Sequence, residues 1–184
     1  MLVQAAGSGV SVAGIQIAKM YGARVLATAG SDAKLERALE LGADEAFSYR
    51  DVDVAREVKT RTGGQGVEVV FDHVGSATWQ GSVRALAWQG RLVTCGATTG
   101  AEAAVDLRHL FFKSLSLLGS TMGRRGDLIT ILDHVASGRL RAVVEKTLPW
   151  EEVREAHRLL EERSVFGKVV LTLGEGGDAA GGAS

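Results

Sequence analysis

Short apolar runs alternate with amphipathic stretches along this sequence, and that alternation constrains the fold more than any other feature. The runs are rich in valine, leucine and alanine, as in strands that are buried on both faces. Amphipathic stretches between such strands are typical of helices that cover a parallel sheet. Because a strand–helix–strand crossover is almost always right-handed, we expect an α/β fold with a doubly wound parallel sheet of about six strands, the Rossmann fold.

The expected elements follow one another without an internal repeat or a dividing linker. Strands are expected at 2–5, 24–29, 45–48, 67–72, 91–95, 115–120 and 169–173. Helices are expected from a turn at 6–11 to about residue 21, and then at 31–41, 51–62, 76–87, 127–137 and 150–163. We therefore predict a single domain over residues 1–173. The segment 174–184 (GEGGDAAGGAS) lacks large apolar residues and is predicted to be a flexible tail.

Composition argues against several classes of protein. The 184 residues contain 21 Lys and Arg against 22 Asp and Glu, a balance that argues against a nucleic-acid-binding surface. The single cysteine leaves no internal disulfide framework and fits a reducing compartment, so we expect a cytoplasmic protein. No stretch approaches the ~20 apolar residues of a membrane span, so no membrane partner is expected.

A turn of small residues follows the first expected strand and precedes the first helix. It is made by Gly7, Ser8, Gly9, Val10 and Ser11. A diphosphate binds at such a place, because the helix N-terminus has unpaired N–H groups and small residues let the backbone approach closely. Gly7 and Gly9 match the first two glycines of the dinucleotide fingerprint, whereas Val12 stands at the third. The turn predicts a dinucleotide site, although any tight strand-to-helix turn favours similar residues.

The end of the second expected strand bears on which dinucleotide binds. NAD-selective sites usually have a carboxylate here that holds the ribose hydroxyls. This chain has Ala29, Gly30 and Ser31 instead, which leave room for a 2′-phosphate. Lys34 and Arg50 are nearby candidates for pairing with that phosphate, although most surface Lys and Arg residues are simply solvated. We therefore predict NADP as the cofactor, with NAD as the alternative.

Four segments occur in a specific order along the chain: residues 3–51, which begin with VQAAGSGVSVAG and end with ADEAFSYRD, and then TGGQGVEVVFDHVG, GRLVTCGATTG and VFGKVVL. In this order and spacing they resemble the nucleotide-binding domain of the medium-chain dehydrogenase/reductase superfamily, in its quinone oxidoreductase-like branch. The resemblance implies a dinucleotide-binding domain over residues 1–173 of an NAD(P)-dependent oxidoreductase. Its reaction would be hydride transfer between NADPH and a quinone, enone, alcohol or carbonyl substrate. It also implies that the substrate pocket and any zinc ligands belong to a catalytic half outside this chain.

The resemblance further assigns roles to residues at the carboxyl ends of the strands. It implies that the diphosphate lies over residues 7–11 and that Lys34 and Tyr49 hold the 2′-phosphate. Main chain after the fourth, fifth and sixth strands is expected to border the ribose and nicotinamide: His73, Val74, Gly75, Cys95, Gly96, Ala97, Gly119, Ser120 and Thr121. Ser8 and Ser11 stand where this branch usually has glycine.

The sequence predicts no catalytic residue and no metal ligand within the chain. Cys95 is single and the four histidines are widely spaced, which does not suit a zinc site. The Tyr-x-x-x-Lys pair of short-chain reductases and the Gly-x-Ser-x-Gly nucleophile motif are also absent from the sequence. The chemistry would therefore be that of the cofactor. Two alternatives are a non-catalytic nucleotide-binding or sensing module, and a methyltransferase-like binder, which would normally have an acid at Ala29.

The expected strand at residues 115–120 (LSLLGS) is apolar and follows Phe111 and Phe112. At the edge of a sheet such a strand favours pairing with a second copy of the chain. Members of the resembled family pair in this way. We therefore predict a homodimer through Leu115–Ser120.

Overall fold

The computed structural model of the chain describes residues 1–174. Six strands of this part form a parallel sheet in the order β3-β2-β1-β4-β5-β6. They are β1 (Leu2–Val3), β2 (Leu26–Ala29), β3 (Glu45–Ser48), β4 (Val67–Asp72), β5 (Leu86–Thr94) and β6 (Ser116–Gly119). The chain winds outward from β1 to β3, returns to β4 beside β1, and winds outward again in the other direction. The predicted doubly wound parallel sheet is confirmed.

Helices cover both faces of this sheet. They are α1 (Gly9–Met20), α2 (Asp32–Glu40), α3 (Val54–Arg61) and α4 (Ser76–Ala85). On one face, α1 and α2 share a buried cluster that contains Ile15 and Val3. On the other face, α3 and α4 share a second cluster that contains Val58 and Leu2. Leu2 and Val3 are consecutive strand residues and point to opposite faces, so β1 is the buried centre of a three-layered structure.

The strand order places a topological switch point between β1 and β4. Both strands pair in parallel, with Val3 opposite Phe71, and their carboxyl ends lie side by side. The glycine-rich turn therefore lies next to the turn that follows Asp72. Ligands of open α/β sheets bind outside the carboxyl ends of the strands at such a point.

Several boundaries differ from those predicted: β1 ends at Val3, β2 begins at Leu26 and α3 begins at Val54, and the largest difference lies between α4 and β5. Helix α4 ends at Ala85, before the expected end at residue 87, because β5 begins at once at Leu86. The strand expected at 91–95 is the second part of this longer β5, after a register shift between Val67 and Val69 on its partner β4. A short helix, α5 (Leu107–Phe112), lies between β5 and β6 and was not predicted, since six residues are too few to show a helical period.

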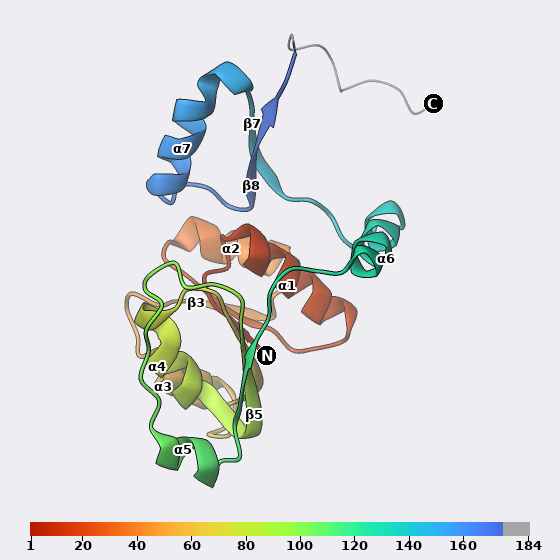
Figure 1. The fold of residues 1–184 in the computed structure, drawn as a ribbon. Coiled ribbons are helices and arrows are strands. Elements are labelled where there is room, and N and C mark those ends of the chain that lie inside the picture. Colours follow the sequence, from red (N-terminus) through yellow and green to blue (C-terminus); the bar gives the residue numbers. More distant parts are fainter. Residues whose placement is uncertain (175–184) are drawn as a thin grey trace.

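The C-terminal part of the described chain forms a second, smaller sheet of two parallel strands, β7 (Val144–Pro149) and β8 (Lys168–Thr172). They are joined by a 3₁₀ turn, η1 (Trp150–Glu152), and by α7 (Val153–Glu161). The strand predicted at 169–173 is confirmed as β8, but it pairs with the unpredicted β7 and does not extend the main sheet. In Figure 1 this unit stands over the end of the main sheet at which α1 and α2 begin.

Helix α6 (Arg125–Ala136) connects the two sheets and confirms the helix expected at 127–137 within a residue or two. None of the helices in the described part of the chain is long and apolar enough to cross a membrane. The tail predicted at 174–184 lies outside the described residues except for Gly174, which is exposed.

Candidate cofactor-binding site

The glycine-rich turn forms the N-terminus of α1. Ser8 has an extended backbone and caps the helix, and its hydroxyl accepts a hydrogen bond from the Val10 amide at 3.3 Å. The first main-chain bond of the helix runs from the Val12 amide to the Ser8 carbonyl at 2.8 Å. The amides of Gly9, Val10 and Ser11 thus belong to the first turn, which has no carbonyl partners within the helix and carries the positive end of its dipole.

Two lysine side chains lie against this turn. A Cβ built on Gly7 would lie 3.0 Å from Cδ and 3.3 Å from Nζ of Lys34, which comes from α2. A Cβ built on Gly9 would overlap the side chain of Lys168, the first residue of β8. Two ammonium groups at the positive end of a helix dipole repel that end unless an anion lies between them. The charge of the turn therefore fits a diphosphate.

Lys168 was not among the residues predicted for the site. The structure brings it there because the Gly167 amide donates to the Gly7 carbonyl at 2.8 Å, so that the entry to β8 runs beside the turn. This approach is a tertiary contact between the two ends of the described chain. No local sequence pattern predicts this contact. The only indication in the sequence was the VFGKVVL segment, which contains Lys168 and contributes to the family resemblance.

Lys34 has a second contact with the C-terminal unit. Its Nζ donates to the main-chain carbonyl of Arg163 at 2.5 Å. Burial lowers the pKa of Lys34, while nearby Glu145 acts in the opposite direction and Arg163 adds to the lowering. An anion beside this ammonium would replace the solvation that burial has removed.

The end of β2 lies against the residues that follow β3. A Cβ on Gly30 would lie 2.5 Å from the Tyr49 hydroxyl oxygen and 3.2 Å from Nε of Arg50. The Tyr49 amide donates to the Ala29 carbonyl at 3.2 Å, and this hydrogen bond holds Tyr49 close to Gly30. Ala29 is buried, so its contribution is main chain. The structure thus brings the predicted Gly30, Ser31, Lys34 and Tyr49 to the same edge of the sheet, together with Arg50.

At the switch point the side chains of Ser11 and His73 bind each other. The Ser11 hydroxyl donates to the Gln4 carbonyl at 2.6 Å and lies 2.9 Å from Nε2 of His73. Since the hydroxyl proton is directed at Gln4, the histidine carries a proton on Nε2 and donates it to Ser11. Burial lowers the pKa of His73, and the nearby Asp72 only partly opposes this. Both side chains are engaged within the protein.

The turns after β4, β5 and β6 line one cavity of about 610 Å³. Gly75 and Ser76 form one wall, residues 95–97 a second, and residues 119–121 a third. Cys95 lies at its exposed edge, and burial of the thiol raises its pKa. The structure thus brings together Gly75, Cys95, Gly96, Ala97, Gly119, Ser120 and Thr121. The other two predicted residues of this region, His73 and Val74, lie in the turn that leads to Gly75.

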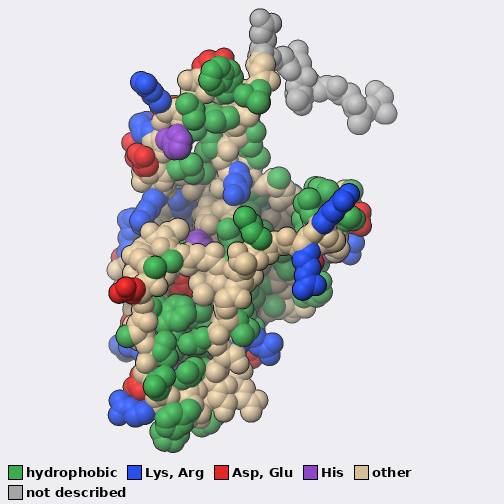
Figure 2. Space-filling view, in the orientation of Figure 1, with side chains coloured by type: hydrophobic (Ala, Val, Ile, Leu, Met, Phe, Trp, Pro, Cys, Tyr) green, Lys and Arg blue, Asp and Glu red, His purple; other side chains and the backbone are tan. Residues whose placement is uncertain are grey.

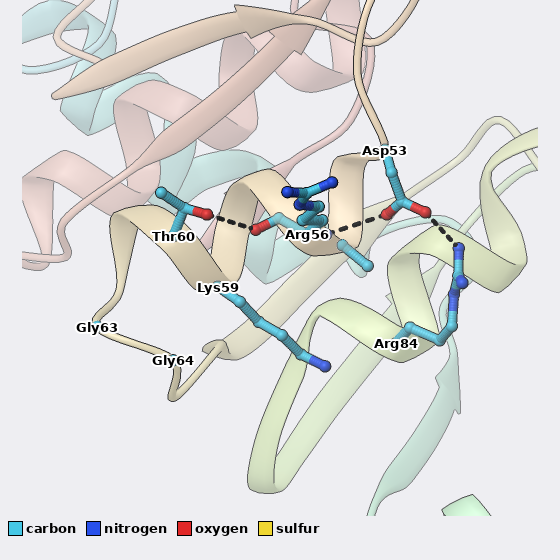
Figure 3. Close-up of a pocket in the computed structure, with 8 residues that line it drawn as sticks. Asp53, Arg56, Lys59, Thr60, Gly63, Gly64 and Arg84 are labelled. Atoms are coloured by element: carbon cyan, nitrogen blue, oxygen red, sulfur yellow. Dashed lines mark hydrogen bonds and ion pairs between the residues drawn. The ribbon is translucent and has the colours of Figure 1, made fainter.

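A second cavity of about 570 Å³ lies between α3 and α4 (Figure 3). Asp53 caps α3 by accepting from the Arg56 amide at 3.0 Å, and its carboxylate pairs with Arg84 at 3.1 Å. Lys59 and the glycines at 63–64 complete the lining. This cavity shares no residue with the predicted site, and its Arg84–Asp53 pair is largely solvated, so it contributes little to stability.

Comparison with known proteins identifies the chain. A model of the zinc-binding dehydrogenase family matches residues 9–137, from the start of α1 to the end of α6. The chain belongs to this family. The predicted resemblance is therefore confirmed.

Among residues 1–174 there is no group of three or more His, Cys, Asp or Glu side chains that could hold a metal ion, so the donor set here does not suit zinc and we assign no step to a metal.

Similar proteins include oxidoreductases about twice as long. The quinone oxidoreductase of Salmonella typhimurium is 33% identical over 182 residues, which cover 92% of this chain and 55% of that protein. The crystal structure of an NAD-dependent alcohol dehydrogenase has a TM-score of 0.89 and 53% identity over 94% of this chain and 50% of its own. For Escherichia coli quinone oxidoreductase complexed with NADPH the TM-score is 0.81 and the identity 31%, over 94% of this chain and 56% of that one. The chain thus spans about half the length of these relatives.

Proposed function

We propose that this chain is the nucleotide-binding part of an oxidoreductase that transfers hydride between NADPH and a quinone, an enone, or an alcohol or carbonyl compound. The observation that carries the proposal is the positive charge at the N-terminus of α1, where Lys34 and Lys168 converge on the glycine-rich turn at the switch point of the sheet. The names of the relatives, which include quinone oxidoreductases and an alcohol dehydrogenase, support the class of reaction.

The proposed roles follow the geometry of the site. The first-turn amides of α1 and the ammonium of Lys168 would hold the diphosphate, because they point positive charge at one place. The turns that line the 610 Å³ cavity would border the nicotinamide. The bound cofactor would supply the hydride, and the residues of this chain would bind and orient it. Residues 1–173 would form one dinucleotide-binding domain, with β8 closing over the turn.

Selectivity for NADPH over NADH is proposed from the edge formed by β2 and β3. Gly30 and Ser31 stand where an NAD-selective site would have a carboxylate, and Lys34 and Arg50 supply positive charge there. The charge of Arg163 also acts on Lys34, whose pKa it lowers, so it adds a further cation near this edge. The E. coli relative solved with NADPH supports this preference, whereas the NAD-dependent alcohol dehydrogenase supports the alternative of NAD.

Titration of the 184-residue chain with NADPH and with NADH, followed by nicotinamide fluorescence, tests the proposal. In Lys34→Glu we expect NADPH to bind about 100-fold more weakly, or about 2.7 kcal/mol, because a carboxylate would replace the ammonium beside the 2′-phosphate. NADH should weaken only about 5-fold, because it shares the diphosphate that lies near Lys34 but lacks the 2′-phosphate.

Lys59→Glu is the matched control, because it makes the same change of charge at the separate cavity between α3 and α4. This variant should bind both cofactors like the parent chain. Equal weakening of NADPH and NADH by Lys34→Glu would remove the NADPH assignment, and no binding of either cofactor at millimolar concentration would contradict the function itself.

We also propose a substrate class, a subunit partner and a compartment for this chain. A small-molecule substrate would bind only together with a catalytic half, since no acid–base pair was predicted within this chain. A second copy would pair along β6, the last strand in the sheet order, to give a homodimer through Leu115–Ser120. A cytoplasmic location is proposed from the single cysteine, which suits a reducing compartment.

A further inference from the structure

A chain of buried polar side chains crosses the molecule beneath the carboxyl ends of the central strands. The Thr28 hydroxyl donates to Oε1 of Gln4 at 2.6 Å, and Nε2 of Gln4 donates to the Ser82 hydroxyl at 2.9 Å. The Ser82 hydroxyl in turn donates to Oδ2 of Asp72 at 2.6 Å. These four residues are at most 1% exposed. This chain of hydrogen bonds connects β2, the residue that follows β1, and α4, and it ends at the buried carboxylate of Asp72 in β4.

Asp72 collects hydrogen bonds from the turn that follows β4. Its Oδ1 accepts from the amides of Val74 at 2.8 Å and Gly75 at 3.3 Å. The Thr78 hydroxyl lies 2.7 Å from Oδ2 and 2.9 Å from Oδ1. With Ser82, four donors surround one carboxylate that is fully buried. Burial of a carboxylate is costly unless such donors satisfy it, so the position of the donors is set by Asp72.

The backbone of this turn is stabilised by main-chain hydrogen bonds with the loop that follows β5. Gly75 has a φ of +94°, and a Cβ there would lie 2.6 Å from the Gly100 carbonyl oxygen. The Thr99 amide donates to the Val74 carbonyl at 2.8 Å, and the Ser76 amide donates to the Gly100 carbonyl at 3.2 Å. The β4 turn and the loop after β5 therefore interlock, and together they wall the 610 Å³ cavity.

We propose that Asp72 is a positioning residue for the nicotinamide half of the cofactor: it orients the turn at residues 73–75 by accepting hydrogen bonds from the Val74 and Gly75 amides, while Thr78 and the chain of hydrogen bonds through Ser82, Gln4 and Thr28 fix the carboxylate. This inference rests on the proposed function. The two hydrophobic clusters of the fold consist of apolar side chains and do not need a carboxylate at this place. The carboxylate instead fixes the orientation of residues 73–75 at the wall of the 610 Å³ cavity.

The test compares Thr78→Val with Thr78→Ser in the 184-residue chain. Asp72→Asn is unsuitable as the first variant, because it disturbs a fully buried group with four donors and can unfold the chain. Valine has the shape of threonine but lacks the hydroxyl that donates to Asp72, whereas serine keeps it. The readouts are the dissociation constants of NADPH and of 2′,5′-ADP, which represents the adenosine half alone, and the amide exchange rates of Val74 and Gly75.

For Thr78→Val we expect NADPH to bind about 10-fold more weakly while 2′,5′-ADP changes less than about 2-fold, and we expect faster exchange at Val74 and Gly75. Thr78→Ser should restore the parent values. A merely structural role would weaken both ligands alike, so an unchanged ratio of the two constants would overturn the positioning role. If the parent chain binds NADPH but Thr78→Val leaves the ratio of the two dissociation constants unchanged, only the positioning role of Asp72 fails. If the parent binds neither ligand, the proposed function fails, and the inference falls with it.

Discussion

Ser11 and His73 illustrate how single residues set the charge of the site. Ser11 stands where the resembled branch usually has glycine. The hydrogen bond between its hydroxyl and His73, at 2.9 Å, holds the imidazole beside the N-terminus of α1. Burial lowers the pKa of His73, so at neutral pH the ring adds no charge to the turn. The positive charge there comes from the helix dipole and from Lys34 and Lys168.

The depressed pKa of His73 predicts a dependence of stability on pH. In the unfolded chain a histidine titrates near pH 6.5, whereas the buried ring takes up its proton only at lower pH. Just below pH 6.5 the unfolded state therefore binds more protons, and the free energy of unfolding falls as the pH falls. Between pH 6.5 and 5.5 this effect amounts to at most about 1.4 kcal/mol.

Urea unfolding of the parent chain and of His73→Gln between pH 7.5 and 5.5 measures the effect. Glutamine can donate to Ser11 but does not titrate, so the variant should lose less stability on acidification than the parent. All other ionisable groups are common to both proteins. Identical pH profiles would show that His73 does not contribute to acid destabilisation.

The residues of the site differ in how far the sequence could predict them. Gly7 and Gly9 have a local signal, because the strand-to-helix turn needs small residues at that spacing. Lys34 follows the end of β2 closely and was predicted from that position. Lys168 and Asp72 have no comparable signal: the first reaches the turn through a tertiary contact, and the role of the second depends on side chains from three other elements.

At the scale of elements, β6 is the exposed edge of the main sheet. Leu117 packs against the core, whereas Leu118 is 46% exposed and Phe111 and Phe112 of α5 lie exposed beside one another, with ring centroids 4.7 Å apart. An apolar edge with unpaired main-chain groups favours association with another strand. This edge is the physical basis of the proposed homodimer.

Sedimentation velocity of Leu118→Lys tests that proposal. The parent chain should sediment as a dimer, and a charge on the edge strand should shift it to a monomer, because the lysine would be buried against its copy. Leu39→Lys on α2 is the matched control, because Leu39 is likewise 46% exposed but lies on a different element, and this variant should leave the dimer intact. A parent chain that stays monomeric at high concentration would exclude pairing through residues 115–120.

The elements whose bounds the sequence predicted best are those with a clear pattern of apolar residues. The buried strands β2 and β4 and helices α1 and α6 fall close to their expected bounds. Strand β7 (VEKTLP) was missed because it is mostly polar and exposed, and a short polar run carries no strand signal. The end of α4 was placed too late because Leu86 and Ala87 continue the helical pattern, while pairing of Leu86 with Val67 makes them strand.

In the whole molecule, two sheets of different size meet at one helix N-terminus. The small sheet returns to the glycine-rich turn through the Gly167–Gly7 hydrogen bond, although it lies beyond the family match at 9–137. Helix α6, which connects them, has five exposed apolar residues: Leu128, Ile129, Ile131, Leu132 and Val135. In Figure 2 green side chains, together with blue ones, cover the place of this helix. A group of exposed apolar residues of this kind usually marks a surface that another part of a protein covers.

The central claim is that a diphosphate rests on the first-turn amides of α1, and an NMR titration of the ¹⁵N-labelled chain with NADPH tests it most directly. The account predicts that the amide signals of Gly9, Val10 and Ser11 shift during the titration and saturate with the dissociation constant measured by nicotinamide fluorescence. It would be contradicted if NADPH bound while those three signals stayed in place, and above all if the amides lining the cavity between α3 and α4 shifted instead.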